Sequence, residues 1–108
     1  MAFDASSFEK TADDTLAAFL DAIDEALGDR LEVDLQGGIL TIELDSGGQY
    51  VINKHGPNRQ IWMSSPKSGA THYDFDEAAG AWRCTRSGRL LNEVLAGELA
   101  QSAGPVKL

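Results

Sequence analysis

The stretch LEVDLQGGILTIELDSGGQYVINK, residues 31–54, indicates the fold class of this chain. Its three runs of strand-forming residues are separated by two glycine pairs, at 37–38 and 47–48. Glycine readily adopts the positive φ values that tight hairpin turns require. In residues 39–44 apolar side chains alternate with polar ones, as in a strand with one buried and one solvated face. The stretch therefore predicts an antiparallel meander whose sheet has an open face.

Further turn signals divide the chain after this stretch. HGPN, PKSGA and DEAAGA, which begin at residues 55, 66 and 76, are rich in glycine, proline and other turn-forming residues. They separate the runs RQIWMSS, THYDF and WRCT, which we interpret as strands. The sheet is therefore expected to have about six strands.

Helical periodicity occupies both ends of the chain. The first helix is expected to start around Ser6 or Ser7, whose hydroxyl can cap the first turn, and to end near Gly28. A second helix is expected after residues 86–88. Apolar residues recur at helical spacing in both: Leu16, Phe19, Leu20, Ile23 and Leu27 in the first, and Leu90, Leu91, Val94, Leu95 and Leu99 in the second. The prediction is an α+β fold, a two-layer α-β sandwich with both helices on one sheet face, in the order α-β-β-β-β-β-β-α.

Length and composition limit the class of protein. The 108 residues, 43% of them hydrophobic, suit one domain spanning residues 1–108. Cys84 is the one cysteine, so no internal disulfide can form and a reducing compartment is favoured. We find no signal peptide, transit peptide or apolar run long enough to span a membrane. The expected location is the cytoplasm, with no membrane association.

Acidic residues are concentrated at the start of the chain. The net charge is −8, and twelve of the 17 acidic residues lie in residues 1–45, against Lys10 and Arg30. This segment should repel nucleic acid and attract cations or basic protein surfaces. A helical wheel places five carboxylates on one face, clear of the apolar stripe: Asp13, Asp14, Asp21, Asp24 and Glu25.

The strand at residues 59–65 carries a tryptophan among polar side chains. Ile61 and Met63 suit the covered face of the sheet, which leaves Gln60, Trp62 and Ser64 for the open face. Alternation places Asn53 on the same face. An aromatic side chain on a rigid sheet is typical of a protein interface. The alternative is that the indole is covered by a loop or the C-terminal segment, or that the register is shifted by one residue.

Several of these stretches together resemble the frataxin family. They are LTIEL, YVINK, PNRQIWMSSPKSG, YDF, AW and LLNEVLAGEL, in this order and after an acidic first helix, between Phe8 and Leu99. The resemblance implies the same α-β sandwich. His55 departs from the family, because animal members usually have glutamine there, and His72 occupies a position that is often basic in them. The absence of a long organelle leader favours a bacterial cytoplasmic member.

The resemblance also implies a function. Frataxins bind iron through acidic residues of the first helix and first strand, and this ridge meets a basic patch on the cysteine desulfurase of iron-sulfur cluster assembly. Their exposed sheet face contacts the scaffold protein and the desulfurase. Carried over by position, the metal ligands are Asp13, Asp14, Asp21, Asp24, Glu25, Glu32 and Asp34, and the partner-binding residues are Asn53, Gln60 and Trp62. The chain is expected to be a monomer, with oligomerisation on iron as an alternative.

Carboxylates are hard donors that suit Fe²⁺ and Fe³⁺, but a convex helix surface supplies few ligands to one ion. Iron binding is therefore expected to be weak and exchangeable. The preferred function is an iron-binding adaptor or regulator that is not an enzyme. The alternatives are a ferroxidase or iron-detoxifying protein that oxidises Fe²⁺ at the ridge, and an acidic module without a metal role. No hydrolase or phosphate-loop motif is present. For His55 and His72 two interpretations remain: each is an iron ligand or a pH-sensitive contact, or each is simply exposed to solvent. Cys84 is expected to be buried and inert.

Overall fold

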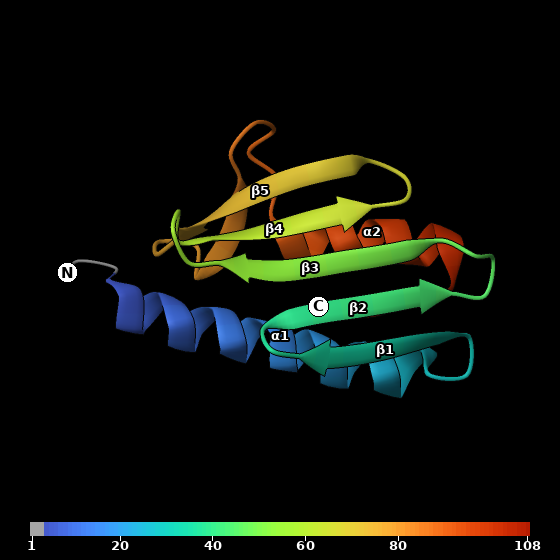
Figure 1. Cartoon of the computed structure of the whole chain (residues 1–108). Coiled ribbons are helices and arrows are strands. Elements are labelled where there is room, and N and C mark those ends of the chain that lie inside the picture. Colours follow the sequence, from blue (N-terminus) through green and yellow to red (C-terminus); the bar gives the residue numbers. More distant parts are fainter. Residues whose placement is uncertain (1–3) are drawn as a thin grey trace.

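The computed structural model describes residues 4–108, and two helices flank a run of six strands along the chain (Figure 1). The elements are α1 (Ala5–Leu27), β1 (Leu31–Gln36), β2 (Ile39–Leu44), β3 (Gln49–His55), β4 (Gln60–Ser65), β5 (Gly69–Asp76), β6 (Ala81–Cys84) and α2 (Leu91–Ser102).

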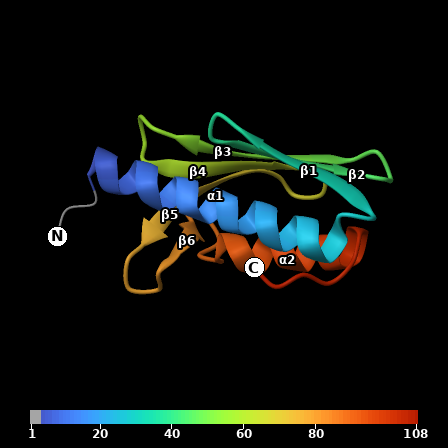
Figure 2. The same cartoon turned by 90° about the horizontal axis from the view of Figure 1, so that it is seen from below.

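The strands form one antiparallel sheet in which sequence neighbours are also spatial neighbours, in the order β1-β2-β3-β4-β5-β6. Gly37 and Gly38 make the first hairpin turn with φ values of 58° and 78°, as the glycine pair predicts. Figure 2 shows both helices on the same side of the sheet. The predicted fold class and element order are confirmed, and the second face of the sheet is open.

The first helix begins earlier than predicted. Its N-cap is Asp4, whose Oδ1 accepts a hydrogen bond from the Ser7 backbone N–H at 2.9 Å. This bond is the main reason that the pKa of Asp4 lies below its usual value. The helix thus starts one residue before Ser6, and the predicted cap by a serine hydroxyl is wrong because Asp4 already satisfies an amide of the first turn. The predicted end at Gly28 is confirmed.

Alternating strand residues and the helix stripes form the core. Leu40, Ile42 and Ile52 of β2 and β3, like Ile61 and Met63 of β4, are at most 1% exposed. The helices supply Leu16, Phe19, Ile23 and Leu27 from α1, and Leu91, Leu95 and Leu99 from α2. The other predicted stripe residues differ slightly, since Leu20 and Val94 pack at the margin of this core and Leu90 is the N-cap of α2.

A partly buried polar network fastens α2 to the sheet. Glu98 accepts hydrogen bonds from the Tyr50 hydroxyl at 2.9 Å, the Ser65 hydroxyl at 2.6 Å and the Ser68 hydroxyl at 2.8 Å. Burial, and then the bond to Glu98, raises the pKa of Tyr50 to about 12. The helix layer is therefore held by directional bonds as well as by apolar packing. Within the described residues, no helix is sufficiently long and apolar to cross a membrane.

Candidate functional site

The predicted metal ligands lie on the surface of helix α1 and on edge strand β1, which packs against this helix (Figure 2). All seven are exposed, and we call them the acidic ridge: Asp13, Asp14, Asp21, Asp24 and Glu25 of α1, and Glu32 and Asp34 of β1. Leu31, the first residue of β1, points to the core. Because side chains alternate along a strand, Glu32 and Asp34 point away from the face of Leu31, to the open face of the sheet. The ridge therefore continues around the sheet edge.

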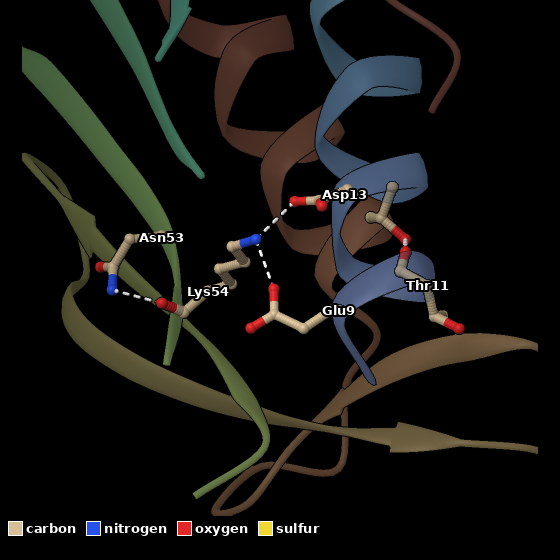
Figure 3. Close-up of polar contacts among 6 residues, drawn as sticks. Glu9, Thr11, Asp13, Asn53 and Lys54 are labelled. Carbon is tan, nitrogen blue, oxygen red and sulfur yellow. Dashed lines mark hydrogen bonds and ion pairs between the residues drawn. The ribbon is translucent and has the colours of Figure 1, made fainter. Parts of the chain in front are cut away.

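The N-terminal part of the ridge is paired with lysines. Lys54 of β3 reaches α1, where its Nζ contacts Glu9 and lies 2.9 Å from Asp13 Oδ1 (Figure 3). These two hydrogen bonds raise the pKa of Lys54. On the helix surface, Lys10 Nζ lies 2.7 Å from Asp14 Oδ2. Asp13 and Asp14 are thus partly neutralised within the chain, and a metal ion would compete with the lysines for them.

The stem of Lys54 passes close to Gly38 of the first hairpin on its way to the helix. A Cβ atom added to Gly38 would lie 2.5 Å from Lys54 Cε, which is too close for any real contact. Gly38 also needs a positive φ of 78°. The glycine therefore serves both the turn and the lysine.

The C-terminal part of the ridge is unpaired. Among residues 4–108 no salt bridge involves Asp21, Asp24 or Glu25, nor the two strand carboxylates Glu32 and Asp34. A surface hollow of about 470 Å³ is lined by Asp24, Glu32, Asp34 and a further carboxylate, Glu43 of β2. This is the region of the ridge that is open to a cation or a basic side chain.

Sequence reasoning did not include Glu43 among the ligands. It lies directly opposite Glu32 in the β1–β2 pairing. Like charges at directly opposite positions of a sheet destabilise it, and a cation between them would relieve the repulsion. The polar position of Glu43 in the alternating run at residues 39–44 could have identified it, once β1 and β2 were paired.

The carboxylates around the hollow do not form a closed metal site. Within the described chain, no three His, Cys, Asp or Glu side chains come close enough together to form a metal site. Carboxylate oxygens suit hard cations such as Fe²⁺, with water completing the coordination shell. The chemistry of the residues therefore fits iron held by few ligands, and it does not fit a closed site.

The predicted partner-binding residues lie on the open face of the sheet, on strands β3 and β4, away from the β1 edge. Trp62 of β4 is directly opposite Asn53 of β3, while its neighbours Ile61 and Met63 face the core. The indole Nε1–H donates to Gln60 Oε1 at 2.8 Å, and Gln60 Nε2 donates to Asp74 Oδ1 at 2.9 Å. The structure thus brings Asn53, Gln60 and Trp62 together and adds Asp74.

Trp62 is half-buried because two histidines cover its ring. Its indole stacks on His55 and on His72, and we call these three side chains the aromatic column. The turn predicted to begin at His55 begins one residue later, since β3 continues through it. His55 and His72 are 17 positions apart in the chain, so only the strand pairing reveals that they share one neighbour.

Cys84 is buried, as predicted, at 6% exposure. Burial raises the pKa of its thiol, but hydrogen bonds from the Ser87 side chain and from the backbone of Ser87 and Arg86 bring the pKa below the usual value. Cys84 packs in the hydrophobic core at the end of β6. Its predicted lack of reactivity stays a prediction.

Comparison with known proteins gives consistent matches. A family model described as a frataxin-like domain matches residues 1–105. The mitochondrial frataxin of Arabidopsis thaliana is 41% identical over 106 residues, which cover 94% of this chain and 57% of that protein. The chain thus spans little more than half of the plant protein. The iron-sulfur cluster assembly protein CyaY of Pseudomonas fluorescens is 35% identical, with 96% of this chain and 93% of that protein covered.

Solved structures agree with these matches. A frataxin from Psychromonas ingrahamii superimposes with a TM-score of 0.86 at 26% identity, covering 96% of each chain. A trimeric frataxin from the yeast Saccharomyces cerevisiae, complexed with ferrous iron, gives a TM-score of 0.75 at 38% identity. The match covers 85% of this chain and 84% of the yeast chain.

Proposed function

Since this chain belongs to the frataxin-like family, we propose that it is an iron-binding adaptor or regulator of iron-sulfur cluster assembly. Relatives named as iron-sulfur cluster assembly proteins support the role in assembly. The proposed partners are the cysteine desulfurase and the scaffold protein on which the cluster is built. The buried, unpaired Cys84 is consistent with the reducing conditions of the cytoplasm, where we place this role.

The observation that carries the proposal is that one small sheet presents two different surfaces. Unpaired carboxylates line the hollow at the β1 edge, and a stacked indole stands on β4 of the open face. The first surface suits a cation or a basic protein patch, and the second suits a shaped protein contact. An adaptor needs both kinds of surface.

Iron is the cargo of such an adaptor and not its resident cofactor. We propose that iron is held weakly by the unpaired carboxylates of the ridge: Asp21, Asp24, Glu25, Glu32 and Asp34. Asp13 and Asp14 bind iron only after their ion pairs with Lys54 and Lys10 have opened. The exposed positions of these side chains support rapid exchange of iron with water or with a partner.

For the protein partners, the same unpaired carboxylates meet a basic patch of the desulfurase, while Asn53, Gln60 and Trp62 contact the desulfurase-scaffold complex through the open face. The location of all three residues on β3 and β4 of that face supports the proposal.

The test is a reconstituted cluster-assembly assay with desulfurase and scaffold, with and without this protein, at several Fe²⁺ concentrations. Desulfurase binding is measured separately. The Asp21→Lys/Asp24→Lys variant should bind the desulfurase at least tenfold more weakly, and its binding should depend less on salt. Glu77→Lys/Glu93→Lys changes the net charge equally but lies outside the ridge, so it should bind like the native protein.

Three outcomes separate the functions considered. Loss of both iron and desulfurase binding in the ridge variant supports the adaptor. Loss of desulfurase binding alone supports an acidic module without a metal role. The ferroxidase alternative requires dioxygen uptake during Fe²⁺ loading that the ridge variant abolishes. A ridge variant with unchanged iron and desulfurase binding would refute the proposal.

A further inference from the structure

The aromatic column covers both faces of one indole. The ring centroids of His55 and Trp62 are 3.7 Å apart with an interplanar angle of 10°, and those of Trp62 and His72 are 4.2 Å apart with an angle of 18°. Rings in contact at these separations leave no space between them for water or for another side chain. The indole therefore has little freedom to leave this orientation while both imidazoles are in place.

The strand register explains how the column forms. Trp62 and His72 are directly opposite each other on β4 and β5, so their rings meet face to face. His55 is directly opposite Gln60, two residues before Trp62, so its ring reaches the indole along the diagonal. Because Gln60 also accepts the indole N–H, the ring is restrained on both faces and at its nitrogen by three strands.

We propose that His55 and His72 are positioning residues that hold the Trp62 indole in the orientation in which it docks. This inference rests on the proposed function, which assigns protein contact to Trp62. A side chain ordered before binding loses less conformational freedom when the complex forms. With both faces covered and the N–H satisfied, the indole offers its outer ring edge to a partner.

The hydrogen bonding of His55 supports a role in ring packing. Its Nδ1 is buried and has no hydrogen-bond partner within the described residues. Buried polar atoms are usually hydrogen-bonded. Because Nδ1 of His55 makes no such bond within residues 4–108, the His55 ring contributes to the column through its flat surface and not through this nitrogen. A ring without nitrogen should therefore replace His55 without loss of the column.

The experiment compares four single variants of the full chain. His55→Ala and His72→Ala each remove one ring, whereas His55→Phe and His72→Phe keep a flat ring and remove the imidazole nitrogens. The first readout is the near-ultraviolet circular dichroism of the isolated protein. The signal of Trp62 is assigned as the part of the native spectrum that Trp62→Ala loses. The second readout is association with the reconstituted desulfurase-scaffold complex.

The alanine variants should lose most of the Trp62 signal and associate about three- to tenfold more weakly, while they still unfold in one cooperative thermal transition. The phenylalanine variants should keep both the signal and the association. An unchanged Trp62 signal in the alanine variants would overturn the proposal, as would phenylalanine variants that bind as weakly as the alanine variants.

The same measurements separate this inference from the proposed function. If Trp62→Ala itself associates normally, the docking role of Trp62 is refuted, and with it the claim that the held orientation serves docking. If Trp62→Ala binds weakly but the alanine variants of the two histidines bind normally, the docking role stands and the positioning role fails.

Discussion

The two tryptophans of this chain lie on opposite faces of the same sheet. Trp82 of β6 is 3% exposed beneath the helices, where Phe8 and Phe75 meet it edge to face at centroid distances of 6.0 and 5.2 Å. Trp62 of β4 is half-buried on the open face, where His55 and His72 stack on it. Each indole N–H has a side-chain acceptor, Thr15 for Trp82 and Gln60 for Trp62.

This difference shows how one residue type serves two purposes. Edge-to-face packing under the helices removes Trp82 from water during folding, so its burial contributes to the stability of the domain. The column leaves part of Trp62 to be buried later, against a partner. Stability and recognition should therefore be separable by mutation.

The largest expected effect is that of Trp82→Ala. The change removes the ring between Phe8 and Phe75 and leaves a cavity beside α1, so the free energy of unfolding should fall by about 4 kcal/mol. Denaturant unfolding measures it, with Trp82→Phe as a control that keeps a ring and loses less. A loss below about 1 kcal/mol would contradict the assignment of Trp82 to the core.

The second effect concerns the open face. Trp62→Ala should weaken association with the desulfurase-scaffold complex by about 2 kcal/mol, because a docking aromatic loses its buried area. The free energy of unfolding should change by less than about 1 kcal/mol. Calorimetry measures the association, and Ser64→Ala, on the same face of β4, is the matched control. If Trp62→Ala lost several kcal/mol of unfolding free energy and bound the complex normally, Trp62 would serve stability and not recognition.

A smaller effect on stability is expected from loss of the ion pairs that Lys54 makes between the sheet and helix α1. Lys54→Met keeps most of the stem but removes the charge that pairs with Glu9 and Asp13. The free energy of unfolding should fall by roughly 1 kcal/mol, since both carboxylates are about half exposed. Fe²⁺ binding, measured by anaerobic calorimetry, should tighten because the two carboxylates become available.

Lys10→Met is the control for this prediction, because it frees Asp14 on the helix surface without touching the sheet. It should alter stability less than Lys54→Met. Weaker iron binding by the Lys54 variant would show that the lysine orders the ridge and does not compete with the metal.

The smallest effect on the free energy of unfolding at neutral pH is expected from the ionisation of Tyr50, whose pKa is raised to about 12. The unfolded chain loses this phenol proton near its ordinary pKa of about 10, and the folded chain keeps it longer. Stability should therefore be insensitive to Tyr50 below pH 10 and should fall as the pH rises from 10 to about 12. Absorbance at alkaline pH follows the ionisation, and Tyr50→Phe separates Tyr50 from Tyr73. Ionisation of Tyr50 near pH 10 would mean that the phenol is open to solvent.

Much of the fold was predictable because it is encoded at short range. Alternation in ILTIEL identified Leu40, Ile42 and Leu44 as core residues, and all three are buried. The same rule placed Ile61 and Met63 inside and Trp62 on the open face. The start of α1 was missed because Asp4, Ser6 and Ser7 are all good capping residues, and propensity does not choose among them.

The candidate site was predictable only in part. The exposure of the five ridge carboxylates on α1 follows from the helical period, and all five are exposed. Their pairing does not, because Lys54 lies 45 positions from Glu9 and 41 from Asp13. Glu43 was missed for the same reason, since its partner Glu32 is known only from the register of β1 and β2.

Periodicity along the chain was thus sufficient to predict the helices, the strands and which side chains share a face, because a helix or strand repeats every few residues. That Trp62 stands on the open face was decided by the structure, since a register shifted by one residue would have reversed the faces of its strand. Which distant side chains meet was set by strand register and by the packing of α1 on the sheet. The aromatic column and the lysine contacts of the ridge belong to this second class, because each joins residues that no local pattern relates.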